Sequence, residues 1–162
     1  MKSWQTKIAG SEFKVMRLQE VSLDNPTTDT PEAIEKYLRA RLPASLRWNP
    51  DTENFIVILL NTRRVPIGFE IISNGTLQTL LIHPREVFKP AIVLGAAAIV
   101  LAHNHPSGDP TPSESDIKVT RHLIRAGQLL SIGVMDHIIL GTVTESRPKG
   151  YSSLRELGYF YT

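Results

Sequence analysis

Four polar side chains stand at fixed spacing between an apolar segment and a helix-like segment of this 162-residue chain. They are His103 and His105, followed by Ser113 and Asp116. Zinc binds nitrogen and oxygen ligands tetrahedrally, and a catalytic zinc site keeps one of its four positions open for water. Two histidines and one aspartate would fill the other three positions. The segment therefore predicts a hydrolytic zinc site formed by His103, His105 and Asp116.

The composition narrows the class of protein. The length and the 41% of hydrophobic residues fit one domain with a core of its own. Eighteen basic residues nearly balance sixteen acidic ones, so we expect no strong nucleic-acid-binding surface. The absence of cysteine excludes thiolate zinc sites and fits a reducing compartment. No signal-peptide pattern follows Met1, and the apolar run 91–102 is too short to span a bilayer. We therefore expect a cytoplasmic protein that does not associate with membranes.

Strands and helices alternate through the middle of the chain, as judged from the period of the apolar residues. The strands are expected at 55–60, 65–73, 76–82, 97–102, 134–141 and 142–146. The helices are expected at 31–42, 84–94 and 113–126, the last closed by Gly127. Segment 12–23 is consistent with a strand or an irregular lead-in, and 24–31 with a linker. This order indicates an α/β fold, with a mixed sheet and helices on both of its faces.

The four polar residues occupy the junction between a buried strand and the following helix. Alternate side chains of an extended segment point the same way, so His103 and His105 can face one ion. Asp116 falls on the first turn of the helix that begins at Ser113. Ligand sites of α/β folds lie beyond the strand ends, which is where this segment is predicted to be.

A zinc hydrolase also needs a base that takes a proton from water. Glu70 lies in a strand whose other residues are mostly apolar, and a carboxylate there is costly unless it has a partner. Glu86 lies in the first turn of a predicted helix, where a carboxylate simply favours the helix dipole. Glu70 is therefore the better candidate.

Each of these residues also has a plainer interpretation. Ser113 and Asp116 together could be only a helix cap. A pair of histidines two residues apart is more often incidental than ligating, and Glu70 could be a salt-bridged strand residue. Asp136 and His137 fit a structural hydrogen-bonding pair at a strand start. It is the combination of candidates, in this spacing and on this frame, that favours a site.

The same residues resemble a known sequence motif. Glu70, the His103-x-His105 pair and the Ser113-x-x-Asp116 pair resemble the JAMM motif of the JAB/MPN metalloprotease superfamily. The uninterrupted string from His103 to Ser113 resembles, more narrowly, the bacterial RadC-like JAB-domain proteins, named historically as DNA repair proteins. Further agreement comes from segments 70–77, 83–89 and 135–141. The similarity extends from about residue 30 to about residue 141.

This resemblance implies zinc as the cofactor, with His103, His105 and Asp116 as its ligands. It implies that Ser113 orients or stabilises the tetrahedral oxyanion and that Glu70 is the general base. The implied fold is the three-layer JAB/MPN fold, a curved mixed β-sheet flanked by helices, as in cytidine deaminases.

The resemblance also implies two parts of the chain, a JAB/MPN domain over 30–162 and an N-terminal extension over 1–29. A strand of the extension would pack on the core. RadC-like proteins commonly begin with a helix-hairpin-helix domain, and 1–29 is too short for one. We therefore do not expect direct nucleic-acid binding.

The leading functional hypothesis is a zinc-dependent peptidase or isopeptidase that acts on a peptide or an isopeptide-linked protein. The alternatives are a non-catalytic JAB-type interaction module and an accessory protein in DNA repair. A nucleobase deaminase is excluded, because its zinc signature requires cysteines. The letters His-Asn-His at 103–105 do not indicate a nuclease site, because three adjacent residues of an extended segment cannot all face one metal.

Overall fold

The computed structural model describes residues 4–8, 11–15, 28–75 and 82–160. Its main element is a five-stranded sheet in the order β4-β3-β5-β6-β7. The strands are β3 (Asn54–Leu60), β4 (Pro66–Asn74), β5 (Ala98–Asn104), β6 (Gly133–Leu140) and β7 (Tyr151–Ser153). Neighbouring strands are antiparallel except β5 and β6, which are parallel. Two further strands, β1 (Trp4–Ile8) and β2 (Ser11–Val15), pair with each other in a sheet of their own.

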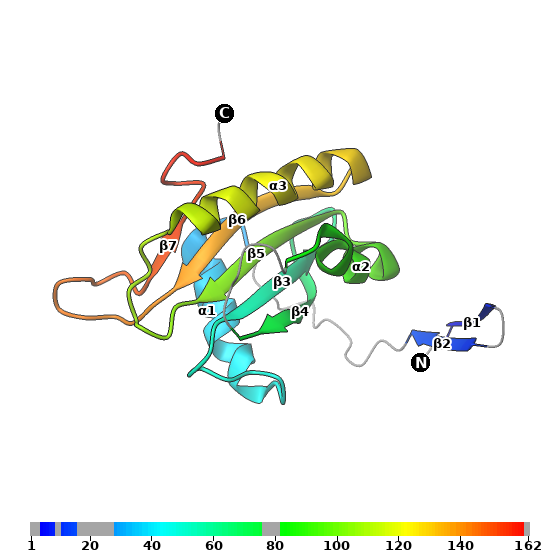
Figure 1. The fold of residues 1–162 in the computed structure, drawn as a ribbon, viewed down its shortest axis with the longest axis horizontal. Coiled ribbons are helices and arrows are strands. Elements are labelled where there is room, and N and C mark those ends of the chain that lie inside the picture. The colour runs from blue at the N-terminus through cyan, green and yellow to red at the C-terminus, as the bar shows by residue number, and fades with distance from the viewer. Residues whose placement is uncertain (1–3, 9–10, 16–27, 76–81, 161–162) are drawn as a thin grey trace.

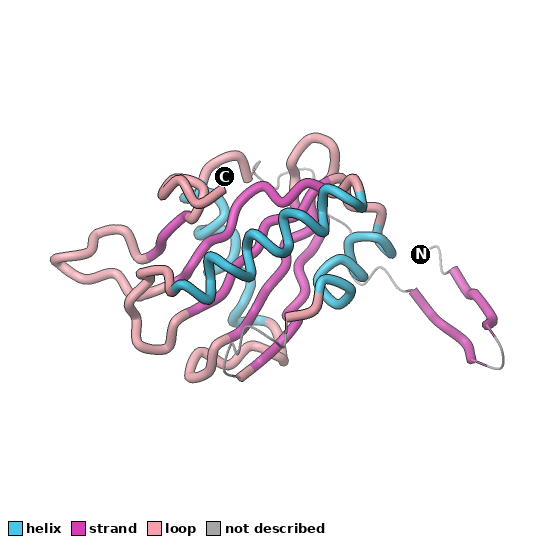
Figure 2. Tube along the Cα trace, turned by 45° about the horizontal axis from the view of Figure 1, so that its top comes forward, coloured by secondary structure: helices cyan, strands magenta, loops and turns pink. Residues whose placement is uncertain are grey.

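Helices cover both faces of the five-stranded sheet (Figures 1 and 2). The helical elements are α1 (Pro31–Arg41), the 3-10 helix η1 (Leu42–Ala44), α2 (Pro84–Leu94) and α3 (Glu114–Leu130). One apolar core lies between the sheet and α1, and a second lies between the sheet and the pair α2 and α3. The expected mixed α/β sheet with helices on both faces is therefore confirmed. Among the described helices, none is long and apolar enough to cross a bilayer.

The central strand β3 shows why the sheet needs cover on both sides. All seven of its residues are buried, and six of them are a continuous apolar run. Ile56 and Ile58 face the core of α1, whereas Phe55 and Val57 face the core of α2 and α3. A strand that is apolar on both faces loses the most exposed apolar surface when helices pack on each side.

The connection from β5 to β6 determines where the site lies. Parallel strands need a crossover, and here the crossover is α3. The chain leaves β5 at Asn104, runs through a loop and enters α3 at Glu114. The amino-terminal end of α3 therefore lies at the carboxyl end of β5, the position at which α/β sheets bind ligands.

Helix α3 is longer than the sequence indicates. It continues to Leu130, so the expected end at Gly127 is wrong. A Cβ atom on Gly127 would lie 2.4 Å from the carbonyl oxygen of Ile132 and 3.2 Å from the ring of Phe88. Glycine is therefore needed here chiefly because the chain folds back over it at Ile132, with the Phe88 ring of α2 also close, and Ser131, in the left-handed region, caps the helix instead.

Of three further predicted strands, one is absent from the structure and two lie largely or partly outside the described residues. The segment 142–146 is not a strand, because it belongs to a loop that Arg39 holds through the carbonyls of Gly141 and Gly150. The last strand of the sheet is β7 instead. The strand expected at 76–82 falls, apart from its last residue, outside the described residues. Of segment 12–23, the first residues belong to β2 and the remainder lies outside the described part.

We expect the metal-free protein to keep its fold. Both apolar cores are built from side chains other than the three proposed ligands, so burial of these cores does not require an ion. Circular dichroism should show native secondary structure and a cooperative melt after chelation, and zinc should raise the melting temperature only by binding. His105→Ala, which lacks one of the three ligands, should melt at the same temperature with and without zinc. A chelated protein without secondary structure would contradict this expectation.

Candidate metal centre

Three side chains converge at the carboxyl end of β5, and they are the three that the sequence indicates. One nitrogen each from His103 and His105 and one oxygen from Asp116 all lie within 4.8 Å of one another. The two Nε2 atoms are 3.0 Å apart. The closest nitrogen–oxygen pairs are 3.3 Å for His103 with Asp116 and 3.8 Å for His105 with Asp116.

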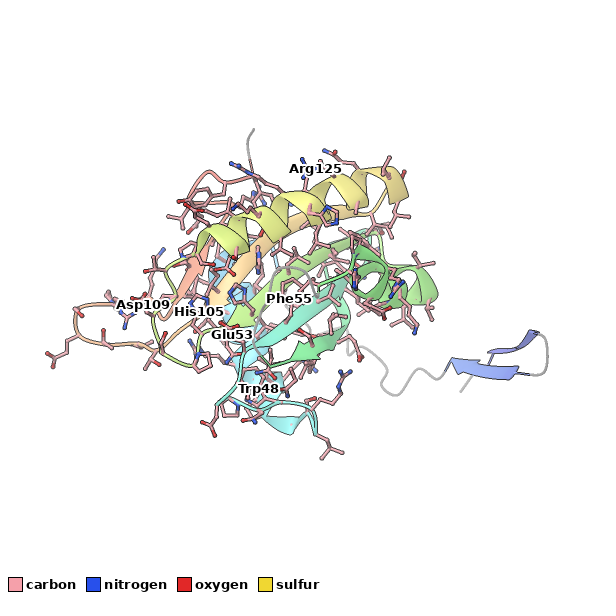
Figure 3. All side chains as sticks on the ribbon, viewed as in Figure 1. Trp48, Glu53, Phe55, His105, Asp109 and Arg125 are labelled. Atoms are coloured by element: carbon pink, nitrogen blue, oxygen red, sulfur yellow. The ribbon has the colours of Figure 1, made fainter. Side chains whose placement is uncertain are left out.

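The cluster is buried on one side and open on the other. His103, in β5, has no exposed surface, and Asp116 is 4% exposed. His105 follows the end of β5, and 15% of its side chain is exposed. Figure 3 shows it at the end of the sheet, beside the loop that carries Asp109. A ligand would therefore reach the cluster from the side of His105.

Asp116 is oriented by the helix cap at the start of α3. Its Oδ2 accepts hydrogen bonds from the backbone N–H and the hydroxyl of Ser113, at 2.7 and 2.6 Å. In return, the Ser113 hydroxyl accepts a hydrogen bond from the Asp116 N–H. This reciprocal capping box confirms the plainer interpretation of these residues. It also serves the cluster, because it leaves Oδ1 directed at His103.

His105 is held through the nitrogen that faces away from the cluster. Its Nδ1 lies 2.6 Å from the carbonyl oxygen of Asp109. A carbonyl only accepts hydrogen bonds, so Nδ1 carries the hydrogen and Nε2 keeps its lone pair. The loop that supplies this carbonyl turns at Gly108, whose φ is 77°, and a Cβ there would meet the Thr142 side chain at 2.7 Å.

His103 is held by His137, which the sequence predicts to pair with Asp136 instead. Its Nδ1 lies 2.8 Å from Nε2 of His137, a fully buried residue of β6. Asp136 does accept a hydrogen bond from the backbone N–H of His137, as expected, but its carboxylate also binds Ser153. Side chains alternate along a strand, so the consecutive residues Asp136 and His137 point to opposite faces of the sheet. Only the pairing of β5 with β6 reveals which side chain meets His103.

Burial keeps both inner histidines neutral. Burial lowers the pKa of His103 to about 4, although Asp116 acts in the opposite direction. Burial also holds the pKa of His137 well below its usual value, and neighbouring His103 adds to this effect. Both imidazoles are therefore uncharged near pH 7, the form in which histidine binds metals.

The cluster fits a divalent metal ion by its donor chemistry. Tetrahedral zinc with bonds of about 2.0–2.1 Å to nitrogen and oxygen holds two ligand atoms about 3.3 Å apart. The two Nε2 atoms are 3.0 Å apart and His103 Nε2 lies 3.3 Å from Asp116 Oδ1, both near that value, and all three ligand atoms lie within 4.8 Å of one another. Imidazole nitrogens and a carboxylate oxygen are a common ligand set of catalytic zinc sites. The residues present therefore suit zinc.

Glu70 does not join this cluster. It lies on β4, and β3 separates β4 from β5. Its carboxylate pairs with Arg47 at 2.6 Å, and 47% of its side chain is exposed, so the expected buried carboxylate is not found. Glu70 and Glu86 line a groove of about 360 Å³ that contains none of the three cluster residues. The role of Glu70 as a base stays a prediction.

Another carboxylate, that of Glu53, which the sequence analysis does not single out, lies closer to His103 by the register of the strands. Glu53 immediately precedes β3, and Phe55 of β3 pairs with His103. Figure 3 shows Glu53 and His105 at the same end of the sheet. Asn104, between the two histidines, fixes this segment by accepting from the N–H of Asn54. The sequence does show an acidic residue, Glu53, directly before a buried strand. It indicates a base at the site only once β3 is known to be antiparallel to β5.

We expect the stability of the metal-free protein to fall between pH 7 and pH 5.5. His103 and His137 have lowered pKa values in the folded state and bind protons only in the unfolded state around pH 6. Their contribution is therefore present above pH 6.5 and is lost as the pH falls, by roughly 2 kcal/mol in total over this range. Urea unfolding at several pH values measures it. His122→Gln, at an exposed position, should leave the pH dependence unchanged, and a flat profile would refute the assignment.

Comparison with known proteins agrees with the geometry. A family model described as RadC-like JAB domain matches residues 28–159. A UPF0758 protein of Symbiobacterium thermophilum is 45% identical over 141 residues, which cover 87% of this chain and 53% of that protein.

Two further relatives carry the same family name. A UPF0758 protein of Rubrobacter xylanophilus is 45% identical over 133 residues, 82% of this chain and 53% of the relative. One of Moorella thermoacetica is 57% identical over 91 residues, 56% of this chain and 40% of the relative. The chain thus spans about half the length of the curated relatives it matches. Since the family model covers most of it, the chain belongs to the family of RadC-like JAB domains.

Proposed function

We propose that this chain is a zinc-dependent hydrolase that cleaves an amide bond in a peptide or an isopeptide-linked protein. The observation that carries the proposal is the convergence of three hydrogen-bond acceptors: His103 Nε2, His105 Nε2 and a carboxylate oxygen of Asp116. Such a group is stabilised by a cation between its members. Three protein ligands would leave the fourth position of a tetrahedral site for the reaction.

His103 and His105 would hold the ion through Nε2, and Asp116 would hold it through Oδ1. When bound, zinc lowers the pKa of water to about 7 and polarises a carbonyl group. The hydrogen bonds from Ser113 to Asp116 keep the carboxylate in place. We also propose that Ser113, which is exposed at the start of α3, stabilises the oxyanion of the substrate by turning its one hydroxyl hydrogen from Asp116 Oδ2 to the substrate, while its backbone N–H keeps its bond to Oδ2.

A pocket beside His105 offers room for a substrate. It measures about 390 Å³ and is lined in part by His105, Pro106, Trp48 and Thr142. Its walls combine apolar side chains with polar groups, as do most sites for small ligands and peptide segments. His105 belongs both to this pocket and to the cluster. A substrate whose scissile bond lies near His105 could therefore place an adjacent side chain of its own in the pocket.

The chain offers two carboxylates for proton transfer, Glu53 and Glu70. The base takes a proton from the attacking water and passes it to the leaving amine. Such a base must reach the reacting atoms directly or through one water. Strand register favours Glu53, because β3 adjoins β5 and Phe55 is paired with His103. Glu70 lies one strand further away and has Arg47 as its partner.

We expect one zinc ion per chain. Elemental analysis of protein purified without chelators measures it, and His105→Ala should reduce the zinc content strongly because it removes one of three ligands. Glu53→Gln serves as the matched control, since the base is not a ligand and its loss should leave the zinc content near that of wild type. A folded, concentrated wild type that takes up no zinc would refute the metal site.

We expect Glu53→Gln to lower turnover by roughly 100-fold or more, the usual scale for a general base. Glu70→Gln, which removes a carboxylate of the same length, should then retain most of the activity. Zinc-loaded proteins are assayed on a library of peptides and isopeptides. A large loss with Glu70→Gln and a small loss with Glu53→Gln would reverse the assignment and make Glu70 the base.

A further inference from the structure

A buried histidine that the proposed reaction does not use lies directly behind the cluster. The ring of His137 is fully buried, and both of its nitrogens have partners. Nε2 lies 2.8 Å from Nδ1 of His103, and Nδ1 lies 2.5 Å from the hydroxyl of Thr120 on α3. That hydroxyl lies in turn 2.6 Å from the backbone carbonyl oxygen of Asp116. The four groups form one chain of hydrogen bonds from one ligand candidate to another.

The last contact determines the direction of every hydrogen bond in the chain. The carbonyl oxygen of Asp116 can only accept, so the Thr120 hydroxyl must donate to it. The hydroxyl oxygen then accepts from Nδ1–H of His137. A neutral His137 with hydrogen on Nδ1 has its lone pair on Nε2, which accepts from Nδ1–H of His103. His103 is thereby left with a lone pair on Nε2, the atom that faces His105 and Asp116.

The reverse direction is less favourable. It would place the Thr120 hydrogen on the bond to His137 and leave two oxygens, those of Thr120 and Asp116, 2.6 Å apart without a hydrogen between them. A doubly protonated His137 would also force His103 to accept at Nδ1. It would bury a positive charge completely, which is costly without a paired anion. The described neighbours of this ring, His103 and Thr120, supply none.

We propose that Thr120 and His137 are positioning residues that hold His103 in the tautomer with hydrogen on Nδ1, so that Nε2 is ready to bind the metal before the metal arrives. This inference deepens the proposed function and rests on its metal site. Partners of this kind behind a ligand histidine fix the orientation of its ring and raise its basicity. Here the chain also returns to the backbone of Asp116, and it therefore connects two ligands that lie on β5 and α3.

The tautomers can be measured directly in the metal-free protein. Replacing the exposed His83 and His122 by glutamine leaves three histidines, whose ring nitrogens are observed by long-range ¹H–¹⁵N correlation NMR. We expect hydrogen on Nδ1 and no hydrogen on Nε2 for both His103 and His137 at neutral pH. Hydrogen on Nε2 of His103 would overturn the proposal. This measurement needs neither zinc nor activity, so it tests the chain of hydrogen bonds even if the proposed function fails.

Zinc affinity tests the consequence for binding. Thr120→Val keeps the shape of the side chain but removes the hydroxyl, so it should weaken zinc binding by roughly 10- to 100-fold, as is typical when a partner behind a ligand is lost. Thr120→Ser restores the hydroxyl and should bind zinc within about threefold of wild type, as judged by competition with a chelator. An equal affinity of Thr120→Val and wild type would overturn the proposal.

A matched control separates positioning from stability. Thr28 is also buried and donates its hydroxyl to a backbone carbonyl, that of Arg64. Arg64 follows the carboxyl end of β3, opposite the end at which Phe55 pairs with His103. Thr28→Val should therefore reduce stability as Thr120→Val does and leave zinc affinity unchanged. Equal losses of zinc affinity in both valine variants would show a general effect of destabilisation and would refute a positioning role for Thr120.

Discussion

Three acceptor atoms face one another at the carboxyl end of β5, and the described residues place no hydrogen-bond donor between them when His103 and His105 are protonated on Nδ1. Lone pairs in such proximity repel, and burial of His103 and Asp116 excludes much of the water that would screen them. The surrounding structure must therefore keep the acceptors in place by other contacts. This requirement accounts for the hydrogen bonds on the far side of each cluster residue.

Each member of the cluster meets the requirement in the same way, through a polar atom that faces outward. His105 donates from Nδ1 to the carbonyl of Asp109, and Asp116 accepts at Oδ2 from Ser113. His103 is anchored to His137, and this contact differs from the others because it joins two strands. The first two anchors are local in sequence and follow from the loop and the helix cap. The third forms only when β5 and β6 have paired.

This difference explains how much of the site could be predicted from the sequence. The three ligand candidates lie on one strand end and the next helix start, so their spacing alone brings them together. The base could not be chosen in this way, because the choice between Glu53 and Glu70 depends on the order of β4, β3 and β5 in the sheet. Periodicity predicts strands but not their neighbours. The early end assigned to α3 failed for a related reason, since Gly127 is needed where the chain turns back at Ile132 and where the Phe88 ring of α2 packs, and neither contact is visible in the periodicity.

The pairing of β5 with β6 is itself fixed by polar residues on both faces of β6. His137 is directed at the cluster, whereas the preceding residue, Asp136, is directed at the opposite face and accepts from Ser153 on β7. A shift of β6 by one residue would exchange the two faces, because side chains alternate along a strand. A carboxylate would then stand behind His103, and an imidazole would face the hydroxyl of Ser153. The shift would break the hydrogen bond between His137 and Thr120 and the one that Asp136 accepts from the backbone N–H of Arg155, and each buried polar group left unpaired costs about 1–3 kcal/mol. The residues that orient the candidate metal centre thus also help to select the register of the sheet that carries it.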